Sequence, residues 1–472
     1  MEVLQRTANR GSISTGYDID NSCKFEADNA EKMTHTYDSA PTSQKKGTIS
    51  MWFKRTEISS NIGIFQFGDD ASGDYLAVRW GRDIYGSGET YRIRIGGSTN
   101  ITLDGDGAIR DTSAWYHMVI AIDTTQATAT NRFKVYRNGA ELSLSTDNRS
   151  SLTQDTNMAI GENGKDIMIG EGVYKYNGYI AEVNYVDGQQ LTPSDFGEYD
   201  SDSGIWIPKK YTGTYGNNGF YLDFSNASNL GEDQSGNNHD FTLSNITSAD
   251  QATDTPTNNF TTFNTLRRYN QGWVSFKEGA TNVITGSGNF WTTIFNTMAV
   301  NKGKWYFEGE LYSNEITQMF GQTPQPWTEL NIHTAWYLGA RADKQEGAAY
   351  YGSGDDVYYE GGYVNSSAST GGDIISVAMD CDNNKVHFAV NGVYTNSSDP
   401  ANNTNGFAML DDYQYFATAL FPGSATWKYN FGGFTTISIS SAASDENGYG
   451  TFEYAPPSGY YALCTKNLAE YG

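Results

Sequence analysis

The sequence has few residues that crosslink or stiffen a chain. It contains three cysteines and ten prolines in 472 residues. The cysteines, Cys23, Cys381 and Cys464, form no CxxC pair, and an odd number excludes a complete set of disulfides within one chain. We therefore expect small, buried and unbridged side chains, with a Cys23–Cys464 disulfide as the alternative.

Long apolar stretches are also missing. No run approaches the roughly 20 apolar residues that span a bilayer, which predicts no membrane insertion. The first residues, Met1–Arg6, have neither the basic start nor the apolar core of a signal peptide. These patterns predict synthesis in a cytoplasm without secretory export. Any work outside a cell would then be done as part of a larger particle.

Positive charge is scarce as well. The chain has 31 Lys and Arg against 55 Asp and Glu, which gives a formal net charge of -24. Such a surface repels nucleic acid and anionic membranes, so we expect neither as a partner. A need for solubility explains the excess of acid, and calcium binding or a salt-rich environment is the alternative.

What the sequence has in abundance favours β-structure. Glycine (51 residues) and aromatic residues (14% of the chain) suit strands joined by turns. One pattern occurs twice, at 118–139 and 375–392: alternating apolar residues, a closing Asp, and a second alternating strand that runs into Asn-Gly. The alternation places one face of each hairpin on a core, and Asn-Gly supplies the positive φ angles of a tight turn. The repeat predicts two β-sandwich domains.

Strand signals and composition together predict the domain organisation. We expect an all-β chain with two antiparallel β-sandwich, or jelly-roll, domains in tandem. Residues 1–22 are predicted to be an N-terminal arm or peripheral strand, and 23–224 the first sandwich. A polar linker rich in Asn, Asp, Ser and Thr is predicted at 225–265, and the second sandwich at 266–472.

Segments of the first half carry a family resemblance. They are Gly47–Arg55 (GTISMWFKR), Ser113–Val119 (SAWYHMV), Val135–Gly139 (VYRNG) and Gly178–Val183 (GYIAEV). In this order and at this spacing they resemble the strands of laminin-G-like, concanavalin A-like jelly-roll domains. The resemblance covers nearly all of 23–224 and implies a concanavalin-like fold.

Segments of the second half carry a different resemblance. They are Lys302–Glu308 (KGKWYFE), Tyr337–Arg341 (YLGAR), Gly372–Asp380 (GDIISVAMD), Lys385–Val393 (KVHFAVNGV), Phe416–Leu420 (FATAL) and Tyr429–Gly432 (YNFG). They resemble a SPRY domain. The tandem of the two families is similar to virion proteins of tailed phages, in particular marine phages. That likeness implies a place on the virion surface and other virion proteins, of capsid or tail, as partners.

Candidate metal ligands lie in acidic loops. Calcium takes about six to eight oxygen ligands from carboxylates, amides and backbone carbonyls. Asp233, Asn237 and Asp240 would provide three of them, and a second acidic loop, Asp69–Asp74, has a similar composition. A structural turn is the simpler interpretation of both loops.

Catalytic patterns are weak. Glu26–Glu31 has the ExDxxE spacing of laminarinase-type glucanases, whose carboxylates must meet on one strand face. Alanines replace the expected bulky aliphatic residues, and the segment precedes the first clear strand, so we expect a solvated turn. The five histidines are scattered without metal-ligand spacing. GxSxG, HExxH and Walker patterns are missing, and we expect no enzyme.

Aromatic residues in predicted loops are the best candidates for binding. Aromatic faces stack on sugar rings, and neighbouring carboxylates accept hydrogen bonds from hydroxyl groups. Partners of SPRY domains bind at loops on one edge of the sandwich, which the resemblance implies here too. The alternative is that the aromatics cover the core or a subunit interface. The candidates are Trp327, which is bracketed by prolines, and Tyr350, Tyr351, Asp355, Asp356 and Tyr358.

Together these features predict a non-enzymatic virion surface protein, such as a head fibre, a decoration protein or a tail fibre. We expect attachment by weak binding to host-surface glycans, multiplied by many copies on one particle, and a homo-oligomer. A purely structural protein of virion assembly is one alternative. A glycan-cleaving enzyme that uses Glu26 and Glu31 is another.

Overall fold

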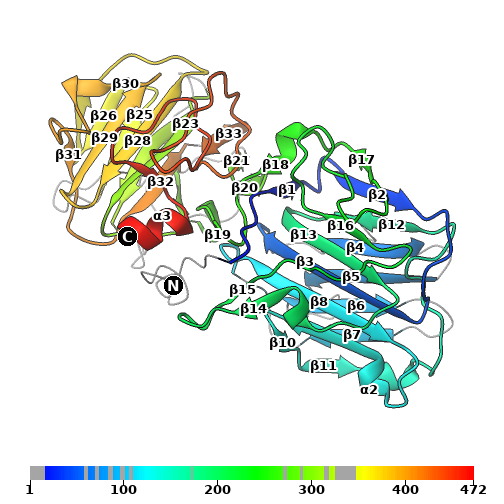
Figure 1. Ribbon diagram of the computed structural model, residues 1–472. Coiled ribbons are helices and arrows are strands. Elements are labelled where there is room, and N and C mark those ends of the chain that lie inside the picture. Colours follow the sequence, from blue (N-terminus) through cyan, green and yellow to red (C-terminus); the bar gives the residue numbers. More distant parts are fainter. Residues whose placement is uncertain are drawn as a thin grey trace. The chain divides into compact units, whose positions relative to one another are not determined.

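The computed structural model in Figure 1 divides the chain into two compact units. The N-terminal unit is Ser14–Asn258, and the C-terminal unit contains Asn259–Gly472. Both are built of β-sheets whose strands pair almost entirely antiparallel, which confirms the predicted fold class. The structure describes residues 16–57, 62–69, 74–82, 89–95, 101–105, 109, 111–171, 174–268, 274–286, 291–312, 318–324, 338, 347–421 and 423–472.

The N-terminal unit is a sandwich of two eight-stranded sheets. The first has the order β10-β9-β8-β3-β13-β1-β18, and β16 pairs with β13 outside this path. Its strands are β1 (Ser22–Phe25), β3 (Lys46–Arg55), β8 (Tyr116–Asp123), β9 (Phe133–Arg137), β10 (Ala140–Glu141), β13 (Gly178–Asp187), β16 (Phe220–Leu222) and β18 (Gln251–Ala252).

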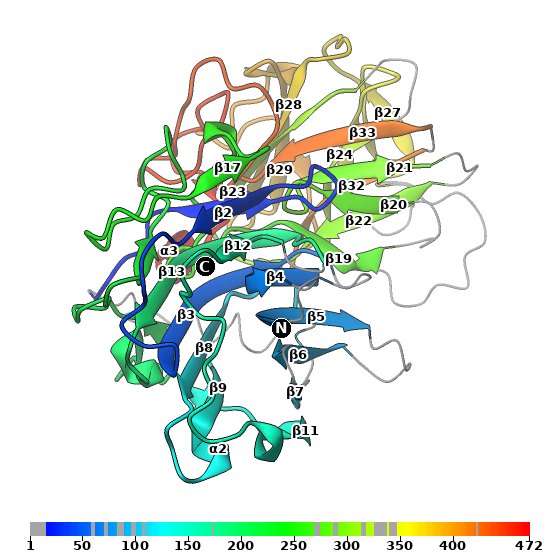
Figure 2. The ribbon, with the colours of Figure 1, turned by 90° about the vertical axis from the view of Figure 1, so that its right-hand side faces the viewer.

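The second sheet of this unit has the order β11-β7-β6-β5-β4-β12-β2-β17. Figure 2 shows the two layers, with β3, β8 and β9 in one and β4, β5 and β6 in the other. A separate two-stranded sheet joins β14 (Gly197–Tyr199) to β15 (Trp206–Pro208). The strands of the second sheet are β2 (Lys32–Thr36), β4 (Ile62–Asp69), β5 (Asp74–Arg82), β6 (Glu89–Ile95), β7 (Ile101–Gly105), β11 (Leu144–Asp147), β12 (Asp166–Ile169) and β17 (Thr242–Ser244).

Alternation along β3 shows how the sequence builds this sandwich. Ile49, Met51 and Phe53 are buried in the core between the two sheets. The residues between them, such as Trp52 and Lys54, point to the opposite face of the sheet because successive side chains of a strand alternate. Each large apolar side chain taken from water stabilises the fold by roughly 1.5–3 kcal/mol, so the register of β3 is well determined.

The prediction of a polar linker at 225–265 is wrong, because most of this segment is folded into the N-terminal unit. Residues up to Asn258 belong to the N-terminal unit, where they form β17, the 3₁₀ helix η4 (Ser248–Asp250) and β18. Phe241 and Ile246 are buried in the core of that unit. Many of the polar side chains that suggested a linker are used in hydrogen bonds. Asp250, for example, accepts from the backbone N–H of Thr247 at 2.8 Å in a capping box.

The C-terminal unit contains a seven-stranded sheet and a nine-stranded sheet. The seven-stranded sheet has the order β19-β22-β32-β24-β25-β26-β27. Its strands are β19 (Phe263–Arg268), β22 (Thr292–Asn296), β24 (Gln318–Thr323), β25 (Ala348–Tyr351), β26 (Asp356–Tyr359), β27 (Gly362–Asn365) and β32 (Tyr415–Leu420).

The nine-stranded sheet has the order β20-β21-β33-β23-β28-β29-β30, with β31 paired to β29 and β34 parallel to β23. Aromatic residues such as Trp305, Phe307 and Trp427 fill the core of the unit. The strands are β20 (Val274–Lys277), β21 (Asn282–Thr285), β23 (Lys304–Glu310), β28 (Ile374–Asp380), β29 (Lys385–Val390), β30 (Val393–Tyr394), β31 (Phe407–Ala408), β33 (Ala425–Asn430) and β34 (Tyr461–Ala462).

The repeated sequence pattern forms the same local structure in both units. Strands β8 and β9 pair in one unit, and β28 and β29 in the other. Asn138 and Asn391 have φ angles of 47° and 49°, and each is followed by a glycine in a two-residue turn. Each asparagine side chain also accepts a backbone N–H, from His117 and from Ile374 respectively. The tight turns are therefore confirmed.

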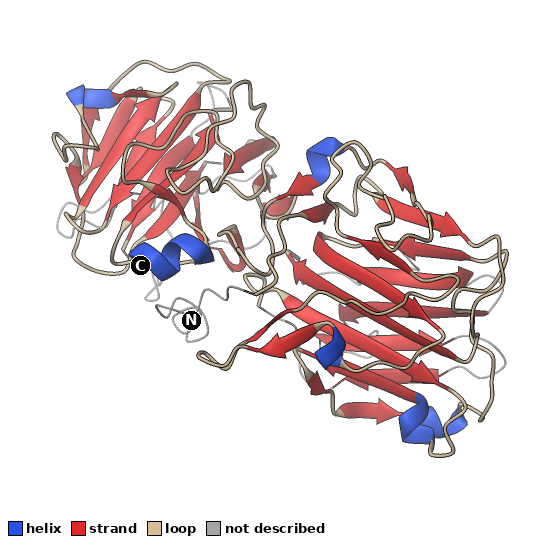
Figure 3. Ribbon diagram, viewed as in Figure 1, coloured by secondary structure: helices blue, strands red, loops and turns tan. Residues whose placement is uncertain are grey.

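Helices are short in the described part of the chain, as the blue segments in Figure 3 show. No helix among the described residues is long and apolar enough to cross a membrane. The three cysteines are buried and none of them is in a disulfide, which confirms the first expectation and gives no support to the Cys23–Cys464 alternative. The remaining helices are α2 (Ala129–Arg132), α3 (Thr465–Tyr471) and the 3₁₀ segments η2 (Arg149–Ser151), η3 (Pro193–Asp195) and η6 (Thr395–Ser397).

Candidate functional site

The segment that carries most of the predicted binding residues is not a loop. Residues 348–365 form the strands β25, β26 and β27 at one end of the seven-stranded sheet. Tyr350 is fully buried in the core beside Val357, and its hydroxyl donates to the carbonyl of Ser367 at 2.7 Å. Burial raises the pKa of Tyr350 to about 12. The expectation that Tyr350 is an accessible loop residue is therefore wrong.

The opposite face of these strands carries three neighbouring tyrosines. Tyr351, Tyr358 and Tyr363 lie on β25, β26 and β27, and the strand register places Tyr358 directly opposite Tyr363. The Tyr363 ring lies 4.6 Å from that of Tyr358 and 5.9 Å from that of Tyr351, between ring centroids. We call these residues the tyrosine cluster. Tyr363 is 59% exposed, Tyr351 is half-buried and Tyr358 is buried.

An apolar layer supports the tyrosine cluster from within the same sheet. Tyr358 packs in a small hydrophobic cluster with Phe295 of β22, Met319 of β24 and Tyr415 of β32. This cluster is distinct from the core between the sheets, to which Tyr350 belongs. The rings of the tyrosine cluster therefore rest on a packed support, and a ligand that stacks on Tyr363 would meet a surface with little conformational freedom to lose.

The two predicted acids have different roles. Asp355 has a φ of 53° at the turn after β25, and its Oδ1 accepts from the N–H and the hydroxyl of Ser369 at 2.8 and 2.9 Å. Its carboxylate therefore holds the local chain. Asp356 lies opposite Tyr351 in the register, on the face of the tyrosine cluster. It places a hydrogen-bond acceptor beside the aromatic surface. Trp327 lies outside the described residues.

The predicted calcium loop is held together by its own hydrogen bonds. Both carboxylate oxygens of Asp233 accept: Oδ1 from the N–H groups of Tyr221 and Ser235, and Oδ2 from the Ser235 hydroxyl and the N–H of His239. These donors occupy the lone pairs that a cation would need.

The other two proposed ligands are also used within the loop. The Asn237 amide donates to the carbonyls of Gly216 and Gly219, and Asp240 accepts from the N–H of Asp233. This pattern is that of a structural turn, and calcium at Asp233, Asn237 and Asp240 stays a prediction.

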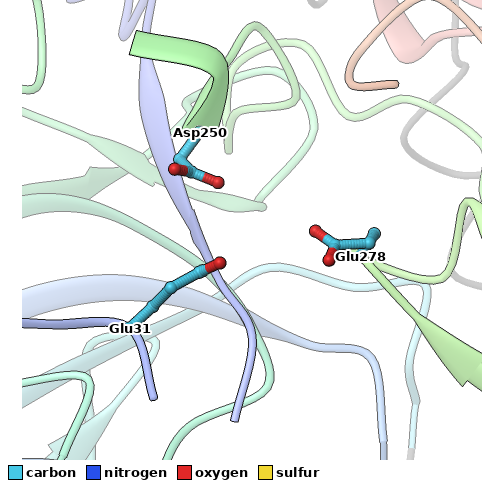
Figure 4. Close-up of side chains that lie close together, drawn as sticks. All are labelled: Glu31, Asp250 and Glu278. Carbon is cyan, nitrogen blue, oxygen red and sulfur yellow. The ribbon is translucent and has the colours of Figure 1, made fainter. Parts of the chain in front are cut away.

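The turn between Glu26 and Glu31 is solvated as predicted, since Asp28 and Asn29 are exposed, but the two glutamates themselves are buried. They are 3% and 2% exposed, in the connection from β1 of one sheet to β2 of the other. Nζ of Lys24 lies 2.9 Å from Oε1 of Glu31 and 2.8 Å from Oδ1 of Asp250. Figure 4 shows the Glu31 and Asp250 carboxylates; Glu278, also drawn there, belongs to the C-terminal unit. Glycan cleavage requires two acids on one strand face. Glu26 and Glu31 flank a turn and do not form such a pair.

An aromatic row in the N-terminal unit was not predicted from the sequence. Trp52 stacks on His117 at 4.7 Å between ring centroids, His117 stacks on Trp206 at 5.9 Å, and Trp206 meets Tyr199 edge-on at 4.9 Å. Tyr199 is 57% exposed, so the row runs from a buried indole to a surface phenol. Trp52 and His117 lie on predicted strands, but nothing in the sequence indicated that β14 and β15 would cover them.

A pair of histidines was also missed, because their distance in the sequence hides their contact. The rings of His35 and His239 lie 4.9 Å apart, and Nδ1 of His35 lies 3.0 Å from the carbonyl oxygen of Asp240. Burial lowers the pKa of His35. Within the described ranges, no third imidazole, thiol or carboxylate joins this pair closely enough to form a metal site.

The family comparison concerns the N-terminal unit. Residues 28–195 match the family described as the concanavalin A-like lectin/glucanases superfamily. The match covers less than half of the chain. Together with the two antiparallel sheets, it supports a concanavalin-like domain in the first half, as the sequence predicted. No protein of curated function matches the sequence.

Solved structures show distant likenesses. The SPRY domain of human HERC1 has a TM-score of 0.27 and 15% identity over 35% of this chain and 96% of that one. A heptameric SAP-like pentraxin from Limulus polyphemus has a TM-score of 0.28 and 16% sequence identity. The match covers 38% of this chain and 80% of that one. A candidate carbohydrate binding protein from Bacteroides ovatus has a TM-score of 0.32 and 14% sequence identity. The match covers 48% of this chain and 58% of that one. With TM-scores this low, none of these likenesses carries an argument about function.

Proposed function

We propose that this protein is a non-enzymatic attachment protein that binds glycans at the tyrosine cluster. The observation that carries the proposal is the exposed ring of Tyr363, which is 59% accessible and packed against Tyr358. The apolar face of a pyranose ring buries well against such a phenol, because stacking removes apolar surface of both partners from water. Asp356 on the same face would accept hydrogen bonds from sugar hydroxyl groups.

The charge of this region favours neutral sugars over acidic ones. The segment from 347 to 380 has no Lys or Arg, and the whole chain has a formal net charge of -24. The acidic residues of the segment are Asp355, Asp356, Glu360, Asp373 and Asp380. Uronic, sialic or sulfated sugars would be repelled by these carboxylates. We therefore propose neutral hexoses as the ligand class.

Weak sites become effective when they are repeated. Tyr199 of the N-terminal unit is also exposed and packed edge-on against another aromatic ring, that of Trp206. Two stacking sites in one chain, and several chains in a homo-oligomer, would raise the retention on a glycan-coated surface without a tight single site. Display on a phage particle, beside other virion proteins, is part of this proposal. It is supported by the tandem of sequence resemblances.

A purely structural role is the alternative. In that case, the tyrosine cluster would be covered by another virion protein or by a second copy of the chain. Glycan cleavage has less support, because the Glu31 carboxylate is bound by Lys24, by the N–H of Glu26 and by the amide of Asn29.

Glycan arrays test the proposal. The full chain, displayed in many copies on beads, is expected to be retained on a subset of neutral glycans, and free sugar of the same kind should release it. Whole host-type cells provide a second surface. Absence of retention on arrays and on cells, at high copy number, would contradict glycan binding and favour the structural alternative.

A further inference from the structure

Three oxygen atoms meet beneath the surface of the N-terminal unit. Oε1 of Glu182 lies 2.8 Å from Oη of Tyr17 and 2.7 Å from Oη of Tyr221. The two tyrosine oxygens lie 2.8 Å from each other. All three separations are typical of O–H···O hydrogen bonds, so each contact needs one proton between its two oxygens. We call this group the oxygen triad.

The number of protons decides the charge of Glu182. Each tyrosine hydroxyl brings one proton, which satisfies two of the three contacts. An ionised Glu182 brings no proton. The third contact would then join two oxygen atoms with no proton between them, next to a buried negative charge. A neutral carboxylic acid supplies the missing proton, and each oxygen then donates once and accepts once.

The backbone places Glu182 at this position under strain. Its φ is 52°, in the left-handed region that residues other than glycine rarely adopt. The pairing of β13 with β3 shifts between Ala181 and Asn184, where β13 carries one extra residue. Such a bulge turns a side chain away from its regular direction. Here Glu182 is 7% exposed and directed to the two tyrosines.

The geometry points to a proton-dependent latch: Glu182 is held as a neutral acid and closes a ring of three hydrogen bonds that ties residues 16–21 to the sheet. Loss of its proton opens the ring and loosens Tyr17. The segment has a second attachment at Ile19, whose N–H donates to Thr257 Oγ1 at 3.0 Å and whose carbonyl accepts from that hydroxyl at 2.9 Å. This second attachment holds no titratable group.

The charged and titratable surroundings agree with a neutral Glu182. Burial is the largest influence and raises the pKa of Glu182, Asp223 raises it as well, and the net pKa is about 7. The hydrogen bonds of the two tyrosines and the charge of Lys210 act in the opposite direction. Tyr215 stacks on Tyr221 and donates to Asn184, and burial keeps its hydroxyl protonated.

The direction of the pH effect follows from this shift. The pKa of Glu182 in the folded unit is above its ordinary value of 4.5, so the folded state binds the proton more tightly than the unfolded state does. The contribution of the latch is complete below pH 4.5 and is lost as the pH rises through about 7. Above that pH, the protection of residues 16–21 should fall by up to about tenfold per pH unit.

Two measurements on the full chain test the latch. The first is the infrared band of protonated carboxylic acids, recorded for the wild type and for Glu182→Gln. The wild type should show one more protonated acid at about pH 6, and that difference should vanish by about pH 8.5. Glu308→Gln is the matched control, because Glu308 is another buried glutamate whose pKa is raised by burial, to about 6. It should remove a different band.

The second measurement is amide hydrogen exchange of residues 16–21, corrected for the intrinsic pH dependence of exchange. The wild type should lose protection between about pH 6 and about pH 8.5, whereas Glu182→Gln should not. Tyr17→Phe removes a single hydroxyl and serves if Glu182→Gln fails to fold; it should lower protection at pH 6 and flatten the pH dependence. A Glu182 that is ionised at pH 6, or equal pH dependence in all three proteins, would overturn the latch.

Discussion

The indole N–H of Trp206 donates to Nδ1 of His117 at 3.0 Å. Since Nδ1 must accept, the other ring nitrogen carries the proton, and Nε2–H donates to the hydroxyl of Ser50 at 2.8 Å. Both nitrogens of a buried imidazole are thereby satisfied in the neutral form. This relationship fixes β15 over the outer face of β8 and supports the ring of Tyr199 at the surface.

Acid should therefore weaken the N-terminal unit through His117. Burial lowers its pKa from 6.5 to about 3, so the unfolded chain binds this proton more readily than the folded unit does. The contribution of His117 is complete above pH 6.5 and is lost as the pH falls towards 3, with a slope of at most about 1.4 kcal/mol per pH unit. Denaturant unfolding of the wild type and of His117→Gln across this range measures it. An unchanged slope in the variant would contradict the assignment.

Gly139 should tolerate no side chain, because Trp206 occupies the space. A Cβ at Gly139 would lie 2.5 Å from the indole ring, and its φ is 81°. Gly164 is the matched control, with a φ of 75° and nothing within 4 Å of a Cβ. Gly164→Ala should cost about 1–2 kcal/mol from backbone strain alone, and Gly139→Ala clearly more. Equal unfolding free energies for the two variants would show that Trp206 gives way freely.

The C-terminal unit should lose stability as the pH rises through about 6. Glu308 is fully buried, and it accepts from the Tyr306 hydroxyl at 2.9 Å and from the N–H groups of Glu453 and Tyr454 at 2.9 and 2.8 Å. Burial raises its pKa from 4.5 to about 6. Its contribution is complete below pH 4.5 and declines through pH 6, by about 2 kcal/mol at most. Glu308→Gln should remove this decline in a pH series of thermal or denaturant unfolding; persistence of the decline would refute it.

Breaking the buried ion pair between Lys54 and Asp254 should strongly destabilise the N-terminal unit. Nζ of Lys54 lies 2.7 Å from Oδ2 of Asp254, with both side chains at most 1% exposed, and Trp115 Nε1 donates to Oδ1 at 3.0 Å. Asp254→Ala should cost about 3–5 kcal/mol, because it removes the counter-charge of a buried ammonium group. The exposed pair of Lys134 and Glu141 is the control: Glu141→Ala should cost less than about 1 kcal/mol. Equal costs would contradict this account.

The sequence predicted the fold where local signals and burial agree. Alternation along Met118–Asp123 and the turn at Asn138 belong to one local hairpin, so that short-range patterns were sufficient. The prediction for the segment from 225 to 258 was wrong because its structure depends on long-range contacts instead of local patterns. Its polar residues are paired with distant groups, as Gln251 is with the carbonyl of Phe224, and composition alone gives no sign of such partners.

The sequence predicted several residues of the candidate site but did not predict how the strands arrange them. The sequence singled out Tyr351, Asp356 and Tyr358, and the register places these three on one face. It also took Tyr350 for an exposed residue, although neighbours in a strand point to opposite faces. It did not select Tyr363, because the contact of this residue with Tyr358 depends on a strand pairing that no local pattern announces.

Retention on neutral glycans by three proteins tests the central claim most directly. The proteins are the wild type, Tyr363→Ala and Tyr312→Ala, which removes a 43% exposed tyrosine that packs beside Trp427 instead of the tyrosine cluster. Loss of a stacking ring worth about 0.5–1.5 kcal/mol should weaken each Tyr363→Ala site about two- to tenfold, and multivalent retention by more. Tyr312→Ala should bind as the wild type does. Equal retention of all three would contradict glycan binding at the tyrosine cluster.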